Sequence, residues 1–138
     1  MGRTMEKAIV RNYGDMIMVT RGLVTENEIR TIEVDALVDT GATFFCLPPK
    51  EIEKLGLMYI RSAPVKTANG DVNRRIFGGA KIIIRERDVQ MEVMESDEMT
   101  PPLIGYLILE ALDFVVDPRT QGLIPNPAHD GKWVLDLY

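Results

Sequence analysis

The sequence contains little cysteine and little histidine. Among its 138 residues there is one cysteine, Cys46, and one histidine, His129. A single cysteine cannot form a disulfide within the chain, which agrees with a reducing compartment. One cysteine and one histidine are also too few for a structural zinc site within the chain. We therefore expect no metal and no cofactor, and we interpret Cys46 as a small buried hydrophobic residue.

The sequence also lacks a long apolar run and an excess of positive charge. Its longest uncharged apolar stretch, residues 101–109, is far below the roughly 20 residues that a membrane span needs. The first seven residues contain no apolar segment typical of a signal peptide. A net charge of −5 makes nucleic acid a poor partner. These features predict a cytoplasmic protein that binds neither a membrane nor nucleic acid.

The length predicts one domain over residues 1–138, with a core over about 16–125 and a C-terminal tail over 126–138. The composition, with 46% hydrophobic and 27% charged residues, is typical of a globular protein. The chain is too short for two similar lobes. An activity that needs two similar halves must therefore take the second half from another chain.

Most segments of the chain predict β-strands. Residues 16–20 are apolar and β-branched, residues 29–38 alternate in part, and the turn candidate between them predicts a hairpin. The Asn-Gly pair at 69–70 predicts another hairpin, because a type I′ turn needs positive φ at both central residues. Helices are expected at 50–55 and 106–112, and further strands at 44–47, 81–85, 89–95 (a hairpin around 86–88), 114–116, 122–124 and 133–138. Together, these expected strands and helices predict an all-β barrel or sandwich with one or two short helices.

Charge is unevenly distributed in the middle of the chain. Residues 61–87 carry seven basic and two acidic side chains, whereas residues 88–98 carry five acidic and no basic ones. We interpret the two stretches as neighbouring strands whose exposed faces pair across the ladder. The alternative is a basic rim that prefers acidic substrates.

The most informative segment is residues 36–43, Ala-Leu-Val-Asp-Thr-Gly-Ala-Thr. A carboxylate, Asp39, directly follows an apolar strand and shares a tight turn with a hydroxyl and a glycine. Such a turn holds an acid on a rigid support and lets the backbone approach a ligand closely. The Asp-Thr-Gly triplet by itself also fits an ordinary turn at the end of a strand.

Other motifs accompany this turn in a specific order. Leu37 and Val38 precede it, Ala42 follows it, a hairpin is expected at 67–70, and Leu103-Ile104-Gly105 leads into the helix expected at 106–112. With these motifs, about residues 28–125 resemble the single-domain retropepsin-like aspartic proteases of the cellular kind. The resemblance implies an all-β, retropepsin-like closed barrel. It also implies a homodimer with one active site across its two-fold axis.

The resemblance assigns roles to individual residues. Asp39 matches the catalytic aspartate, Thr40 matches the residue whose hydroxyl locks the two active-site loops together, and Gly41 belongs to the same catalytic turn. Expected substrate-binding residues lie on this turn, on the flap-like hairpin tip and on the turn beneath the active-site loop. They are Ala42, Thr43, Ala68, Asn69, Gly70, Asp71, Leu103, Ile104 and Gly105.

The chemistry of such a pair of carboxylates is that of an aspartic endopeptidase. Two Asp39 carboxylates within hydrogen-bond reach cannot both ionise cheaply, so one keeps its proton and the pair titrates as a unit. The ionised carboxylate takes a proton from a water, and the protonated one polarises the scissile carbonyl of a peptide or protein substrate. This reaction requires no metal.

Two features leave alternatives open. Residues 43–45 are Thr-Phe-Phe, where better-known retroviral relatives have acidic residues soon after the turn. The strand expected at 133–138 either interleaves with a second chain or closes the chain's own sheet. A domain of this fold can also be a catalytically inactive dimerisation or peptide-binding module.

Overall fold

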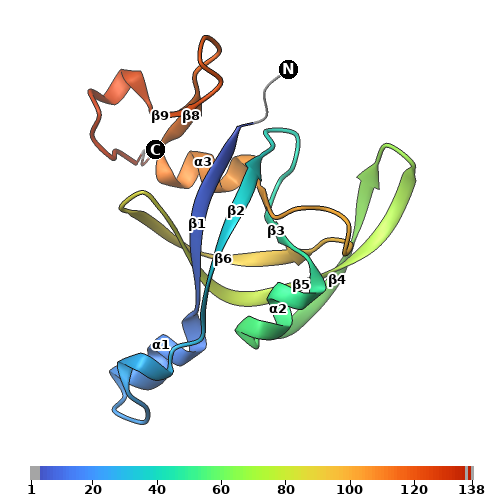
Figure 1. The fold of residues 1–138 in the computed structure, drawn as a ribbon, viewed down its shortest axis with the longest axis vertical. Helices are drawn as coiled ribbons and strands as arrows, with labels where there is room; N and C mark the ends of the chain where they lie inside the picture. Colours follow the sequence, from blue (N-terminus) through green and yellow to red (C-terminus); the bar gives the residue numbers. More distant parts are fainter. Residues whose placement is uncertain (1–3, 136, 138) are drawn as a thin grey trace.

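A closed ring of β-strands forms the centre of the computed structural model, which describes residues 4–135 and 137 (Figure 1). The strands hydrogen-bond in the order β1-β2-β7-β3-β6-β5, and β5 pairs with β1 to close the ring. The predicted all-β closed barrel is therefore confirmed. The bounds are β1 (Met5–Asn12), β2 (Thr31–Val38), β3 (Phe45–Leu47), β5 (Gly70–Ile84), β6 (Arg87–Glu95) and β7 (Leu103–Ile104).

The hydrophobic core fills this ring, because alternate side chains of each strand point inward. Ala8 and Val10 on β1 are completely buried, and so are Phe45 and Leu47 on β3. Strand β1 lies N-terminal to residues 16–20, the expected first strand. The sheet therefore begins earlier, at Met5.

The predicted strand at 16–20 and its hairpin are wrong. These residues belong to helix α1 (Tyr13–Thr20), and the antiparallel partner of β2 is β1. The helix begins there because the Asn12 side chain accepts a hydrogen bond from the Asp15 backbone N–H, an N-cap that outweighs the β-propensity of a short run. A 3₁₀ turn, η1 (Glu26–Glu28), then leads toward β2.

The other two expected helices are confirmed as α2 (Pro49–Leu55) and α3 (Tyr106–Leu112). Helix α2 begins with a proline and is capped at its C-terminal end by Gly56, which adopts the left-handed conformation with φ of 63°. The described residues thus form three α-helices, one more than expected, because α1 replaces a strand. No helix in the described part of the chain has the length and apolar character needed to cross a membrane.

Strand β4 (Met58–Thr67) pairs with β5, outside the ring, and the tip of this β4–β5 hairpin projects away from the barrel (Figure 1). The hairpin is confirmed, but its turn is not type I′. Thr67 pairs with Gly70, and among the described residues of the turn positive φ occurs at Gly70 alone, at 110°. The β5–β6 turn is centred on Arg85 and Glu86, both with positive φ, one residue earlier than predicted.

The uneven charge is largely explained by ion pairs between the β4–β5 hairpin and β6. Arg61 forms two hydrogen bonds of 2.8 and 2.7 Å with Glu92, and Arg75 forms two of the same lengths with Glu95. The predicted pairing between neighbouring strands is confirmed for Arg75 and Glu95, on β5 and β6, whereas Arg61 on β4 reaches Glu92 across β5. These paired carboxylates lie on β6, whereas the arginines lie on the β4–β5 hairpin.

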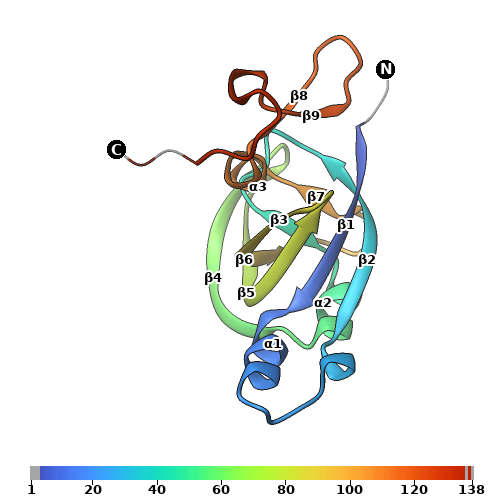
Figure 2. The same cartoon turned by 90° about the vertical axis from the view of Figure 1, so that its left-hand side faces the viewer.

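The C-terminal segment packs over α3 at the end of the barrel opposite α1 (Figures 1 and 2). It contains the predicted strand pair β8 (Phe114–Val116) and β9 (Leu123–Pro125), then a 3₁₀ turn η2 (Pro127–His129). Residues 133–135 form no strand, so over this stretch the chain's own sheet does not gain the expected terminal strand. Residues 136 and 138 of that prediction lie outside the described residues.

Asp113 holds this C-terminal segment together. Its carboxylate contacts His129 Nδ1 at 2.5 Å and accepts hydrogen bonds from Asn126 Nδ2 at 3.1 Å and the Val134 N–H at 3.2 Å. Burial raises the pKa of Asp113, but the hydrogen bonds from His129, Val134 and Asn126 outweigh it, so the pKa lies below its ordinary value. Asp113 is therefore a structural carboxylate.

Gly105 joins β7 to α3 at a point of close backbone approach. A Cβ at this position would lie 2.3 Å from the Phe44 carbonyl oxygen and 2.7 Å from that of Thr43. Both distances are far below van der Waals contact. Only glycine therefore lets this joint pack against the loop that follows β2.

Replacing Gly105 with alanine is expected to destabilise the protein by about 1–3 kcal/mol, the usual cost of forced overpacking. Gly122→Ala is the matched control, because a Cβ there would meet only the Thr120 side chain at 3.4 Å. Urea unfolding of the two variants measures the difference. Equal stability of Gly105→Ala and Gly122→Ala would contradict the close approach.

Asp15 links α1 to β2 through Arg30. Its carboxylate accepts bonds of 2.9 Å from the Arg30 backbone N–H, Nε and Nη2. The hydrogen bond from the Arg30 side chain is the main reason that the pKa of Asp15 lies below its ordinary 3.8, despite partial burial. A carboxyl group whose pKa is lower in the folded protein stabilises the fold when the pH is above its pKa in the unfolded chain. That stability is lost as the pH falls through its pKa in the folded protein.

Asp15→Asn is therefore expected to lower the free energy of unfolding by about 1 kcal/mol at pH 7. The difference from wild type should disappear as the pH falls well below 3.8. Urea unfolding over a pH series measures this difference, with Glu33→Gln as control because its pair with Lys7 is long, at 3.9 Å, and exposed. A difference that does not change with pH would contradict the assigned role of Asp15.

Candidate active site

Asp39 stands at the C-terminal end of β2, in a turn fixed by three hydrogen bonds. Its Oδ1 accepts from the Gly41 N–H at 2.9 Å, and its carbonyl accepts from the Ala42 N–H at 3.1 Å. Its own N–H donates to the Ile104 carbonyl on β7 at 3.0 Å. The carboxylate is thus held by its own turn and by the neighbouring strand.

The strand β7 and the start of α3 support this turn. β2 and β7 run parallel, with Leu37 opposite Leu103 and Val38 opposite Ile104. Beyond Gly105, the first two N–H groups of α3 donate to the carbonyls of Ala42, at 2.8 Å, and Thr43, at 3.2 Å. These bonds connect the Asp39 turn to a helix whose inner face lies in the core, so the turn has a rigid support.

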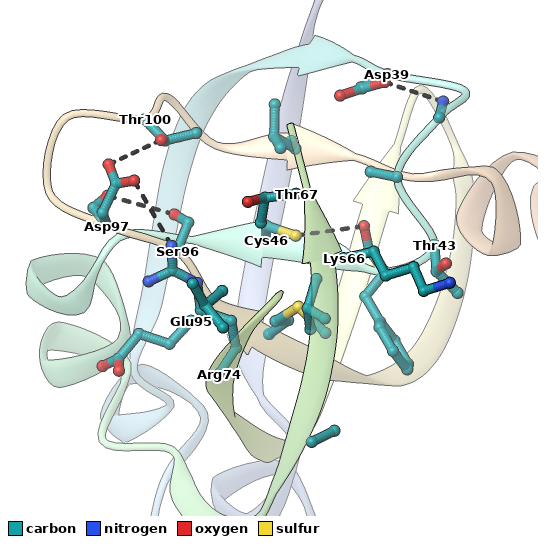
Figure 3. A pocket seen from close by; sticks show the side chains of 18 of the residues that line it. Asp39, Thr43, Cys46, Lys66, Thr67, Arg74, Glu95, Ser96, Asp97 and Thr100 are labelled. Atoms are coloured by element: carbon teal, nitrogen blue, oxygen red, sulfur yellow. Dashed lines mark hydrogen bonds and ion pairs between the residues drawn. The ribbon is translucent and has the colours of Figure 1, made fainter. Parts of the chain in front are cut away.

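A cleft of about 840 Å³ opens between the Asp39 turn and the β4–β5 hairpin (Figure 3). Seven of the residues named from the sequence line it, from the turn, the hairpin tip and β7. They are Asp39, Gly41, Ala42, Thr43, Ala68, Asn69 and Leu103. The fold therefore brings together residues that are as much as 64 positions apart in the chain (103 − 39 = 64).

The other five predicted residues lie around the cleft. Thr40 is exposed on the Asp39 turn, and Gly70 and Asp71 are exposed at the hairpin, just beyond its tip. Ile104 and Gly105 are buried, and they contact the Asp39 turn from beneath. In the single chain these two residues support the site and do not line the cleft.

Several lining residues are not among the site residues predicted from the sequence. They are Phe44, Cys46, Ala63, Pro64, Val65, Lys66, Thr67, Val72, Arg74, Met94, Glu95, Ser96, Asp97 and Thr100. The hairpin members could have been found, because the antiparallel register places Ala63 opposite Arg74 and Val65 opposite Val72. No sequence signal indicated that the segment after β6, which holds Asp97 and Thr100, would line the cleft.

Cys46 lies in the floor of this cleft. It is buried, and burial, together with the nearby negative charge of Asp39, raises the pKa of its thiol to about 11. The thiol therefore stays protonated at neutral pH and is a poor nucleophile. Its interpretation as a small buried hydrophobic residue is confirmed.

A second cavity of about 640 Å³ lies among α3, β8 and the C-terminal segment, and it includes Asp113 and His129. These two side chains are bonded to each other and fix that segment. Within the described residues, no group of three or more potential ligands among His, Cys, Asp and Glu is placed to hold a metal ion.

Three comparisons with known proteins bear on this arrangement. The family described as "gag-polyprotein putative aspartyl protease" matches residues 25–111. No curated protein sequence matches the chain. Among solved structures, the EIAV protease complexed with the inhibitor HBY-793 aligns with a TM-score of 0.54 and 16% identity, over 79% of this chain and 86% of that one.

The solution structure of the simian foamy virus (mac) protease aligns with a TM-score of 0.48 and 19% identity, over 77% of this chain and 91% of that one. The likeness to the EIAV enzyme supports the fold. The family match covers more than half of the chain and includes the Asp39 turn, the β4–β5 hairpin and β7. The chain therefore belongs to the gag-polyprotein aspartyl protease family, and its fold is that of the retropepsin-like aspartic proteases.

Proposed function

We propose that this protein is an aspartic endopeptidase and that its active form is a homodimer. Asp39 of each chain supplies one of the two carboxylates of the active site. The observation that carries the proposal is the position of Asp39, in a hydrogen-bonded turn at the edge of a cleft that the β4–β5 hairpin borders. The family match supports peptide-bond hydrolysis as the reaction.

In this mechanism, the two Asp39 carboxylates share one proton because both cannot be charged at close range. The ionised carboxylate removes a proton from a water, whose oxygen attacks the scissile carbonyl carbon. The protonated carboxylate donates its proton to the carbonyl oxygen, which gives a neutral tetrahedral diol. Proton transfer to the amide nitrogen then allows the C–N bond to break, and one hydroxyl proton returns to the dyad.

Other residues would bind the substrate and hold the dyad. Gly41, Ala42 and Thr43 line the cleft beside Asp39, so their backbone groups can pair with an extended peptide as a strand does. Residues 68–71 of the hairpin would cover the peptide and exclude water. The exposed Thr40 hydroxyl would bond to the second chain's turn and hold the two carboxylates together.

The dimer follows from the number of carboxylates. The motif that places Asp39 occurs once in the chain, and a two-fold axis provides the second copy. A two-fold axis also makes the two carboxylates equivalent, so either of them can hold the proton. A dimer therefore completes a site of which one chain carries half.

Asp39→Asn is expected to reduce peptide hydrolysis by at least on the order of 10²–10⁴-fold, since it removes the general base and acid. The amide retains an oxygen for the Gly41 N–H, so the turn and the dimer should persist. Digestion of a peptide library from acid to neutral pH measures activity, and sedimentation measures assembly. Asp35→Asn is the matched control on the same strand, because Asp35 is exposed and does not line the cleft.

Two results would contradict the proposal. Wild type that hydrolyses no library peptide at any pH, while still dimerising and binding peptides, would indicate the inactive peptide-binding module. An Asp39→Asn variant as active as wild type would show that the carboxylate has no role in the reaction.

A further inference from the structure

Three arginines of the β4–β5 hairpin, Arg61, Arg74 and Arg75, lie near carboxylates. Arg74 differs from the other two in its distance to the carboxylate and in its place in the cleft. Arg61 and Arg75 each make two short hydrogen bonds to one carboxylate, and neither lines the cleft. Arg74 lines the cleft, and among the described residues it forms a long ion pair with Asp97, with 3.8 Å between Nη2 and Oδ2. That distance exceeds hydrogen-bond length, so the guanidinium of Arg74 keeps donors for a ligand.

The carboxylates near Arg74 are already engaged. Both oxygens of Glu95 accept from Arg75. Oδ1 of Asp97 accepts from the Met99 N–H at 3.0 Å and from the Thr100 hydroxyl at 2.8 Å (Figure 3). Oδ2 of Asp97 faces Arg74 in an ion pair that is long, at 3.8 Å, so an incoming carboxylate can compete with Asp97 for the guanidinium of Arg74.

The surroundings of Arg74 on the hairpin are apolar. Arg74 lies opposite Ala63 in the antiparallel register, Val72 lies opposite Val65, and all four line the cleft. The Arg74 side chain is 31% exposed, so most of it is covered and part of it reaches solvent. A charged hydrogen bond formed among apolar neighbours is stronger than one formed in open water.

We propose that Arg74 is a specificity-determining residue that binds an acidic side chain, Glu or Asp, of the peptide in this cleft. The guanidinium accommodates a carboxylate with two parallel N–H···O bonds, which glutamine and asparagine cannot match. The inference rests on the proposed function and names its substrate class as peptides with an acidic residue at one subsite.

Lys66 is the other cation of the cleft lining. It is exposed on β4, and the register places it opposite Asp71 across the hairpin. An exposed lysine offers a point charge without the fixed fork of a guanidinium. Acid selectivity at a single position is therefore assigned to Arg74.

The test measures cleavage of a positional-scanning octapeptide library by wild type and by variants. Wild type is expected to prefer Glu over Gln about tenfold at one position, a typical effect of one charge-assisted hydrogen bond. Arg74→Gln should abolish this preference. Asp97→Asn should increase it, because it removes the competing negative charge while leaving an oxygen for Met99 and Thr100.

Arg61→Gln is the matched control, since it removes an arginine of the same hairpin outside the cleft, and it should keep the tenfold preference. The absence of an acidic preference in wild type would overturn the inference. A preference that survives Arg74→Gln would also overturn it, since another cation such as Lys66 would then be responsible.

Binding measurements separate this inference from the proposed function. The same library, immobilised, is probed with the Asp39→Asn protein and with the Asp39→Asn, Arg74→Gln double variant. A preference for acidic peptides that depends on Arg74 would support the inference even if wild type hydrolyses nothing. Hydrolysis by wild type without any acidic preference in cleavage or binding would overturn the inference and leave the proposed function standing.

Discussion

The site depends on the contact between the Asp39 turn and the joint of β7 with α3. One hydrogen bond from the Asp39 N–H to Ile104, and two from the start of α3 to the carbonyls of Ala42 and Thr43, lock the turn in place. This contact exists only because Gly105 carries no side chain where the backbones approach within 2.3 Å of its missing Cβ. The acid is thus positioned by main-chain bonds, and the core behind α3 keeps those bonds in register.

The other side of the cleft is formed by the β4–β5 hairpin, which is less tightly held than the Asp39 turn. Strand β4 pairs with β5 and lies outside the closed ring, so the hairpin tip is free of the core while its base is anchored. Two bidentate arginine–glutamate pairs, Arg61 with Glu92 and Arg75 with Glu95, anchor that base to β6. A rigid turn opposite a less constrained hairpin is an arrangement that can admit and then enclose an extended peptide.

The parts of the structure that local chemistry determines could be predicted from the sequence. The Asp39 turn, the hairpin near 67–70 and the helix at 106–112 each have signals within a few residues, and the fold follows from their order. Residues 16–20 could not be assigned correctly, because the residue that starts the helix, the N-cap Asn12, lies outside this apolar segment. The role proposed for Arg74 could not be predicted from the sequence either, because it depends on which of several arginines lies close to a carboxylate across the sheet.

In the proposed enzyme two chains share one active site, and mixing wild type with Asp39→Asn protein tests this sharing directly. If the chains pair at random after equilibration, a mixture of equal parts should retain about half of the activity of the wild-type chains, because half of them pair with an inactive partner. A larger excess of the variant should suppress activity further. Activity that stays at the full wild-type value at every mixing ratio, with exchange of chains verified by sedimentation of labelled protein, would contradict a shared site.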